Sequence, residues 1–189
     1  MQPFRNLKSL ALPVAGANVD TDQILPARFL HKPRKDAAGQ GNYAQYLFHD
    51  LRHLVDRPEY PQPQILIAAE NFGCGSSREN AVWALADFGI RVVIAPSFGD
   101  IFYSNCLKNG LLPATLRTDV VAAILAAAEP QTLYVDLFSQ TVTIPDGTRY
   151  GFDIDLFAKQ CLIYGVDELG YTLTLLPQIE EFERAHPES

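Results

Sequence analysis

Two serines and an arginine stand next to one another in a glycine-rich segment, as Ser76, Ser77 and Arg78. An apolar run at 65–69 predicts a buried strand before them, and the stretch 77–88 predicts a helix. Glycines allow a tight turn between the two, and the first turn of a helix offers unpaired backbone N–H groups to an anion. A serine hydroxyl and a guanidinium in that position could bind a carboxylate and stabilise a developing alkoxide.

The same residues also fit a purely structural role. Ser76 and Glu79 are three positions apart and match a capping box, in which a helix cap contributes about 1 kcal/mol. Arg78 does not fit that role, because the helix dipole favours acidic residues in the first turn. Locally unfavourable residues of this kind tend to occur at functional sites. The spacing alone therefore supports a functional site and a helix cap equally.

Two acidic residues, Asp20 and Asp22, flank Thr21 in a polar segment that reaches Pro26. Because proline disfavours a regular helix through this segment, we expect a loop with an Asx turn or solvated carboxylates. Two carboxylates are too few to predict a magnesium site.

Ser97 follows a second apolar run, 91–95, which predicts another buried strand. Ligand sites of α/β proteins usually lie at the carboxyl ends of such strands, but we expect Ser97 to cap the next helix. Asn105 and Asn109 are expected to be caps or polar contacts near the same edge.

Strands and helices alternate after residue 65, which predicts right-handed crossovers and an α/β fold with a central, mostly parallel sheet. Paired strands after residue 130 add antiparallel hairpins. The predicted strands are 65–69, 91–95, 111–116, 132–138, 141–144 and a short one ending near Phe152, and 171–175 is expected to be extended. The predicted helices are 47–55, 77–88, 101–108, 119–128, 154–163 and one after Pro177.

The composition, with 48% hydrophobic and 20% charged residues, is typical of one globular domain spanning 1–189. The formal net charge is −7, and basic residues gather only in a short run at Lys32, Arg34 and Lys35, which disfavours nucleic-acid binding. No apolar run reaches transmembrane length and the N-terminus lacks the apolar core of a signal peptide. We therefore expect a cytoplasmic protein that does not bind a membrane.

The three cysteines, Cys74, Cys106 and Cys161, are odd in number, far apart and not arranged as a C-x-x-C pair. We expect reduced, buried thiols rather than a disulfide or a metal site made by this chain alone. Three cysteines gathered by the fold could in principle hold an iron–sulfur cluster.

In order and over nearly the whole chain, these segments resemble the small subunits of 3-isopropylmalate dehydratase, relatives of the C-terminal swivelling domain of aconitase. The Gly-Ser-Ser-Arg-Glu run at 75–79 is highly specific in that context. The matching segments are 18–26, 70–79, 83–85, 91–98, 100–103, 108–113 and 165–173. The resemblance implies a β/β/α swivelling domain of the aconitase C-terminal type, with a sheet or barrel flanked by helices.

It also implies a two-chain hydro-lyase that isomerises 2-isopropylmalate and 3-isopropylmalate by dehydration and rehydration in leucine biosynthesis. The large subunit would hold a [4Fe–4S] cluster with one iron open as a Lewis acid, while this chain binds no metal. Ser76 corresponds to the family's catalytic base, and Arg78 would lower the cost of its alkoxide. Ser77 and Arg78 would bind the substrate carboxylate, and Thr21 and Asp22 match the family's Thr-Asp pair at the substrate-binding rim.

Two departures from the family pattern bear on the substrate. Asn80 stands where the family usually has histidine, and the segment 31–49 does not match the usual small-subunit loop closely. We expect 31–49 to be a mobile loop, and in this family that region helps to select the side chain of the malate. A homoaconitase-, citraconate- or methylcitrate-type subunit is therefore an alternative. A non-catalytic module that binds carboxylates or RNA is a third reading, which the negative charge disfavours for RNA.

Overall fold

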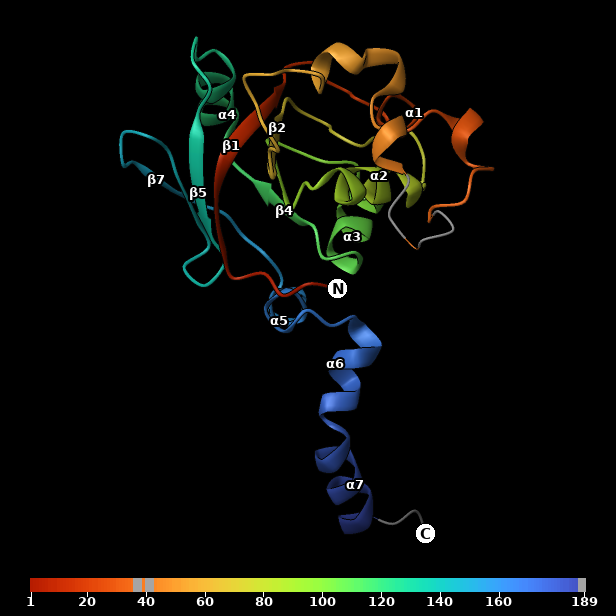
Figure 1. Cartoon of the computed structure of the whole chain (residues 1–189). Coiled ribbons are helices and arrows are strands. Elements are labelled where there is room, and N and C mark those ends of the chain that lie inside the picture. The colour runs from red at the N-terminus through yellow and green to blue at the C-terminus, as the bar shows by residue number, and fades with distance from the viewer. Residues whose placement is uncertain (36–38, 40–42, 187–189) are drawn as a thin grey trace.

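The computed structural model describes residues 1–35, 39 and 43–186, and a mixed β-sheet lies at its centre (Figure 1). Within the described residues the sheet has seven strands in the spatial order β4-β3-β2-β1-β5-β6-β7. They are β1 (Asn6–Val14), β2 (Ile65–Ala68), β3 (Val92–Ala95), β4 (Leu112–Thr115), β5 (Thr132–Asp136), β6 (Thr141–Thr143) and β7 (Arg149–Gly151). β1 to β4 are parallel and β5 to β7 pair antiparallel, so the predicted α/β class with added hairpins is confirmed.

β1 joins the two parts of the sheet, and the sequence analysis did not identify it. Its second half, from Ala11 to Val14, pairs in parallel with β2. Its first half, from Asn6 to Leu10, pairs antiparallel with β5. The strand carries polar residues and a proline, Pro13, which make it a weak strand signal in the sequence.

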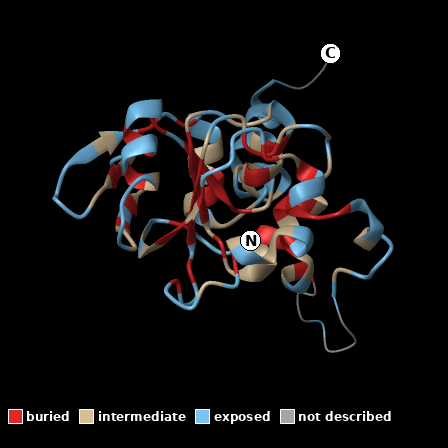
Figure 2. Ribbon diagram, turned by 90° about the horizontal axis from the view of Figure 1, so that it is seen from above, coloured by how far each residue is buried: buried red, intermediate tan, exposed pale blue. Residues whose placement is uncertain are grey.

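The central parallel strands are buried on both faces, as continuous apolar runs predict. In β2, Leu66 and Ala68 belong to one hydrophobic core, and Ile65 and Ile67 belong to the other. Figure 2 shows buried residues running through the middle of the molecule between exposed loops and helices.

Helices cover both cores. α2 (Asn80–Phe88) and α3 (Asp100–Lys108) contribute buried residues to the first core. α4 (Thr118–Leu125) and α5 (Leu156–Tyr164) contribute to the second. The predicted helix 119–128 is too long, because α4 ends at Leu125.

Short 3₁₀ turns connect β1 to β2 after the first helix of the chain, α1 (Thr21–Ile24). They are η1 (Ala27–Phe29), η2 (Tyr43–Tyr46) and η3 (His49–Leu54). The helix predicted at 47–55 is thus a kinked 3₁₀ segment, with non-helical backbone at Leu51. In the predicted loop 31–49, residues 36–38 and 40–42 lie outside the described residues.

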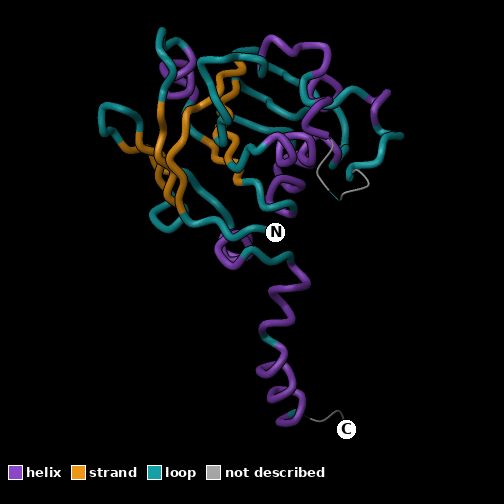
Figure 3. Tube along the Cα trace, viewed as in Figure 1, coloured by secondary structure: helices purple, strands orange, loops and turns teal. Residues whose placement is uncertain are grey.

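The C-terminal part of the chain forms two helices that extend away from the sheet (Figures 1 and 3). They are α6 (Glu168–Thr174) and α7 (Leu176–Ala185). The extended piece predicted at 171–175 is therefore wrong. Asp167 caps α6 by accepting a hydrogen bond from the Gly170 N–H at 2.7 Å, which starts a helix ahead of these residues. No helix in the described part of the chain is long and apolar enough to cross a membrane.

Candidate active site

The segments that follow β1 and β2 meet at the carboxyl edge of the parallel strands. The Gly73 N–H donates to the Val19 carbonyl at 2.7 Å, and the Thr21 N–H donates to the Cys74 carbonyl at 3.0 Å. These bonds tie the segment after β1 to the segment after β2. Parallel α/β sheets bind ligands at this edge, so the predicted motif lies where a site is expected.

Ser97 fastens the segment after β3 to the same place. The Phe72 N–H donates to the Ser97 carbonyl at 3.1 Å, and the Asn71 N–H donates to Ser97 Oγ at 2.8 Å. The expectation that Ser97 caps the next helix is wrong, because the N-cap of α3 is Gly99. The Ser97 hydroxyl joins two loops instead.

Gly73 has no room for a side chain. Its φ is +74°, and a Cβ added there would lie 2.2 Å from the Phe102 ring. Phe102 is buried and packs edge-to-face on Phe72 with ring centroids 5.5 Å apart. The glycine therefore lets the motif loop lie directly on α3.

The Ser76 hydroxyl lies beside the hydroxyl of Thr21, with 2.8 Å between Ser76 Oγ and Thr21 Oγ1. Ser76 is half-buried, whereas Thr21 is only 2% exposed. Thr21 is the first residue of α1, so a short helix holds the hydroxyl partner of the serine. The structure thus brings together two of the residues that the sequence singled out.

The loop predicted around Asp20 is a one-turn helix, α1, and it carries the capping box of this region. Asp20 Oδ1 accepts from the Gln23 N–H at 2.8 Å, and Gln23 Oε1 accepts from the Asp20 N–H at 2.9 Å. α1 ends at Ile24, ahead of Pro26, so the proline does not prevent it.

α2 begins later than predicted, and the capping box expected between Ser76 and Glu79 is absent from the structure described. The first helical residue is Asn80, and the Glu79 carboxylate accepts from Asn109 Nδ2 at 2.7 Å. Ser76 therefore lies four residues before the helix and outside its first turn. Arg78 also precedes the helix, so the expected cost of a cation in the first turn does not arise.

Two asparagines hold the motif loop onto α3, and the sequence identified them only as caps or polar contacts. Asn105 Nδ2 donates to the Ser77 carbonyl at 3.3 Å. One turn later, Asn109 Oδ1 accepts from Trp83 Nε1 at 2.9 Å, in addition to its bond with Glu79. Their spacing of four residues on a helix is the signal that could have indicated one shared face.

Arg78 forms a two-pronged ion pair with Asp22. Arg78 Nη1 contacts Asp22 Oδ1, and Arg78 Nη2 lies 3.2 Å from Asp22 Oδ2. Asp22 Oδ1 also accepts from the Ala27 N–H at 2.9 Å. The hydrogen bond from Arg78 lowers the pKa of Asp22 below its ordinary value, and the same bond raises the pKa of Arg78. Both groups are therefore charged at neutral pH.

The five predicted site residues thus lie in one place. Thr21 pairs with Ser76, Asp22 pairs with Arg78, and Ser77 is exposed between its two neighbours. A guanidinium has five N–H donors, so Arg78 can bind a substrate carboxylate in addition to Asp22. The arrangement offers a positioned hydroxyl and a cation to an anionic substrate.

The cysteines do not gather into a cluster site. Cys74 lies in the motif loop, Cys106 lies on the buried side of α3, and Cys161 lies on α5. Burial raises the pKa of the Cys106 thiol well above its ordinary value, which makes that thiol a poor ligand. Among the described residues, no group of three His, Cys, Asp or Glu side chains is placed to hold a metal ion.

The described flanks of segment 31–49 are fixed to α2. Asp87 accepts from Arg34 at 3.2 Å and from the Tyr43 N–H at 3.3 Å. Arg34 also stacks over the Trp83 ring, 4.8 Å from its centroid. Asn80, which replaces the family's usual histidine, donates to the Tyr43 hydroxyl at 3.4 Å. The substitution therefore contacts this segment.

Comparisons with known proteins agree with the motif. A family model described as the aconitase C-terminal domain matches residues 1–119, and another, described as LeuD_N, matches 122–155. A 3-isopropylmalate dehydratase small subunit from Francisella philomiragia is 46% identical over 98% of this chain and 98% of its own. The chain belongs to the family of 3-isopropylmalate dehydratase small subunits.

Other members of the 3-isopropylmalate dehydratase small-subunit family match equally well. One from Solibacter usitatus is 46% identical, over 99% of this chain and 96% of its own. The crystal structure of a 3-isopropylmalate dehydratase from Methanocaldococcus jannaschii is 27% identical, with a TM-score of 0.68 over 94% of this chain and 99% of that one. The aconitase C-terminal type of fold predicted from the sequence is therefore confirmed.

Gly73→Ala is expected to destabilise the chain by at least about 2 kcal/mol, because the methyl group overlaps the Phe102 ring and the backbone is left-handed. Gly147 is the matched control, since its φ is +88° and a Cβ there meets open space. Gly147→Ala should lower the free energy of unfolding by only about 1 kcal/mol, which is the cost of placing alanine in a left-handed backbone conformation. Urea unfolding measures both, and equal losses would contradict the close packing at Gly73.

Proposed function

We propose that this chain is the small subunit of a two-chain hydro-lyase that interconverts 2-isopropylmalate and 3-isopropylmalate in leucine biosynthesis. The observation that carries the proposal is the Ser76 hydroxyl, bonded to Thr21 at 2.8 Å beside the Asp22–Arg78 pair, in a chain of this family. The names of the relatives favour isopropylmalate over the homoaconitase, citraconate and methylcitrate alternatives. In this proposal residues 1–189 form one swivelling domain that works in the cytoplasm and binds neither nucleic acid nor membrane.

The reaction begins with removal of a proton from the carbon next to a substrate carboxylate. The proton passes to the deprotonated Ser76 Oγ, the C–H electron pair forms the C=C bond, and hydroxide leaves the neighbouring carbon with the C–O electron pair, where a Lewis acid would accept it. Rehydration reverses these steps with the hydroxyl on the other carbon, and Ser76 returns its proton. A [4Fe–4S] cluster on the large subunit would supply the Lewis acid for the hydroxyl.

Thr21 acts through Ser76 in this scheme. A deprotonated serine accepts a hydrogen bond from the Thr21 hydroxyl, which favours the charged form of the base. Because Thr21 is only 2% exposed, its burial supports a positioning role rather than direct contact with substrate. Asp22 orients Arg78, and Arg78 with Ser77 binds the substrate carboxylate.

Ser76→Ala is expected to lower kcat by roughly a hundredfold to ten-thousandfold when assayed with the large subunit, because the base is lost. The circular dichroism spectrum and affinity for the large subunit should not change. Ser139 is the matched control, because its hydroxyl also lies 2.8 Å from a threonine hydroxyl, that of Thr141. A Ser76→Ala enzyme as active as Ser139→Ala would refute the proposed base.

Thr21→Val is expected to lower kcat by about tenfold with little change in KM, because one hydrogen bond to the base is lost. Thr21→Ser should restore kcat, since it returns the hydroxyl. Steady-state kinetics distinguish the positioning role from substrate binding. A rise in KM at constant kcat would show that Thr21 contacts the substrate instead.

Arg78→Lys is expected to lower kcat/KM by at least about a hundredfold, since an ammonium cannot reproduce the planar fork toward Asp22 and a carboxylate. Arg117→Lys is the control, because Arg117 forms a comparable pair with Asp119 on an exposed surface. The control should behave as wild type in the same assay. Equal kinetic constants for the two variants would show that Arg78 does not bind the substrate.

A further inference from the structure

α6 and α7 form an arm, residues 168–185, that leaves the body of the molecule (Figure 3). Neither helix contributes a buried residue in the part of the chain that the structure describes. Apolar side chains three or four positions apart line the arm and are 37–67% exposed. This arm stripe consists of Leu169, Leu173, Leu176, Ile179 and Phe182.

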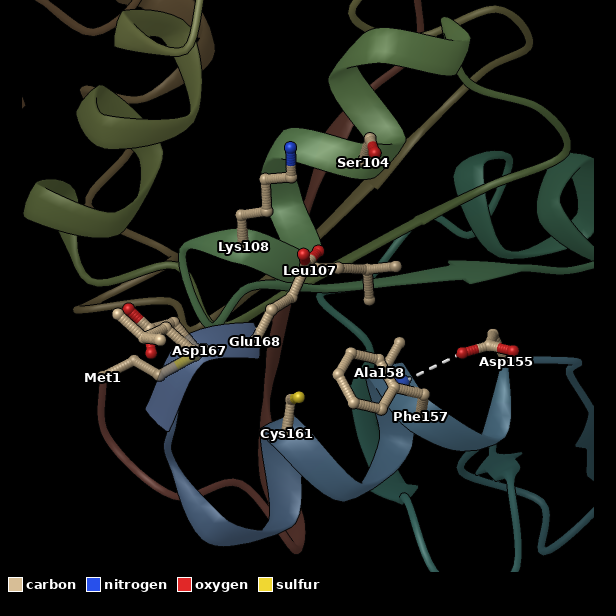
Figure 4. Close-up of a pocket in the computed structure, with 11 residues that line it drawn as sticks. Met1, Ser104, Leu107, Lys108, Asp155, Phe157, Ala158, Cys161, Asp167 and Glu168 are labelled. Atoms are coloured by element: carbon tan, nitrogen blue, oxygen red, sulfur yellow. Dashed lines mark hydrogen bonds between the residues drawn. The ribbon is translucent and has the colours of Figure 1, made fainter. Parts of the chain in front are cut away.

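The first residue of the arm stripe, Leu169, also lines a pocket of about 520 Å³. Figure 4 shows this pocket. Leu107 from α3 and Phe157 and Cys161 from α5 line this pocket, and Leu169 belongs to both the pocket and the stripe. The Phe157 ring packs edge-to-face on Tyr171 of α6, with centroids 5.2 Å apart. Charged side chains, among them Lys108, Asp155 and Glu168, also line the pocket, so its apolar part adjoins the stripe at Leu169.

An apolar surface of this extent requires a partner. A ten-residue helix is marginal in water on its own, and most helical stability comes from packing an apolar face. Contiguous exposed apolar patches mark interaction sites, and anchors three and four residues apart are the pattern of a helix that lies in a groove.

The charges around the stripe indicate the kind of partner. Residues 167–186 contain five acidic residues and one arginine. The charged residues are Asp167, Glu168, Glu180, Glu181, Glu183 and Arg184. Two such arms placed stripe to stripe would bring like charges together, and an anionic membrane would repel the arm as well. The partner surface must be apolar with basic side chains along its rim.

We propose that the arm stripe and its pocket dock onto the large subunit, in an apolar groove with lysine or arginine at its edges. The inference rests on the proposed function, which supplies this partner. The arm lies beyond the residues that the two family models match, yet proteins named small subunits match 98–99% of the chain. The proteins that carry the small-subunit name therefore align with this chain through the arm as well. In Figure 1 it extends away from α1, so docking there adds affinity without touching the site.

The test measures the dissociation constant of the full chain and the purified large subunit by calorimetry, together with isopropylmalate turnover at saturating large subunit. Leu173→Gln with Phe182→Gln is expected to weaken binding by at least about tenfold, because two apolar anchors are lost. kcat at saturation should stay at the wild-type value. Thr174→Gln with Glu181→Gln is the matched control on exposed positions away from the stripe, and it should bind as wild type.

The acidic rim is tested separately. Glu180→Gln with Glu183→Gln is expected to weaken binding and reduce its dependence on salt, because these residues lie beside the stripe. Glu181, on the opposite side of α7 by helical spacing, is the control, and Glu181→Gln should leave the salt dependence unchanged.

Wild-type affinity in the Leu173→Gln, Phe182→Gln variant would overturn the docking surface and leave the proposed function intact. A wild-type pair that binds tightly but does not turn over isopropylmalate would overturn the proposed function, while the docking surface would still be judged by binding. Analytical ultracentrifugation of the chain alone tests whether a second copy of the chain binds to the stripe instead. A dimer that the Leu173→Gln, Phe182→Gln variant abolishes, with large-subunit affinity unchanged, would assign the stripe to a second copy and overturn the proposal.

Discussion

The hydrogen bond between Thr21 and Ser76 sets the position of the serine on which the proposed chemistry depends. It forms because segments that follow neighbouring parallel strands cross at one sheet edge, where backbone bonds from Gly73 and Thr21 fix their register. The threonine is buried and the serine is half-buried. A rigid interior group thereby sets the direction of an accessible one, which is the arrangement that preorganised catalysis requires.

α1 positions both Ser76 and Arg78, although it is only one turn long. Its first residue, Thr21, bonds Ser76, and its second, Asp22, pairs with Arg78. Two consecutive residues on one side of the site therefore hold two alternate residues on the other. The capping box from Asp20 gives this turn a defined start, and its end before Pro26 leaves the chain free to change direction. The capping interactions of α1 thus determine where Thr21 and Asp22 lie in the site.

The sequence predicted the parts of the molecule that depend on local pattern. Apolar runs identified β2 and β3, and the motif identified the five residues that the structure places together. It did not predict where α2 begins, because Glu79 bonds Asn109, a partner thirty positions away, and not Ser76.

β1 and the C-terminal arm escaped prediction for different reasons. β1 is held by partners on both sides, although its own residues favour a strand only weakly. The sequence around Tyr171 alternates like a strand, and the cap at Asp167 overrides that alternation. Long-range strand pairing therefore decided β1, whereas a local cap three residues from its partner decided the start of α6.

The double pairing of β1 has a consequence during synthesis. Asn6 pairs with Asp136, and the Phe4 N–H donates to the Leu162 carbonyl at 2.8 Å. β1 leaves the ribosome well before β5, the strand that pairs with its first half. Such nonlocal pairing slows folding, and the nascent strand carries an unsatisfied edge in the meantime. β1 therefore acquires the partner on its second edge only after β5 has emerged.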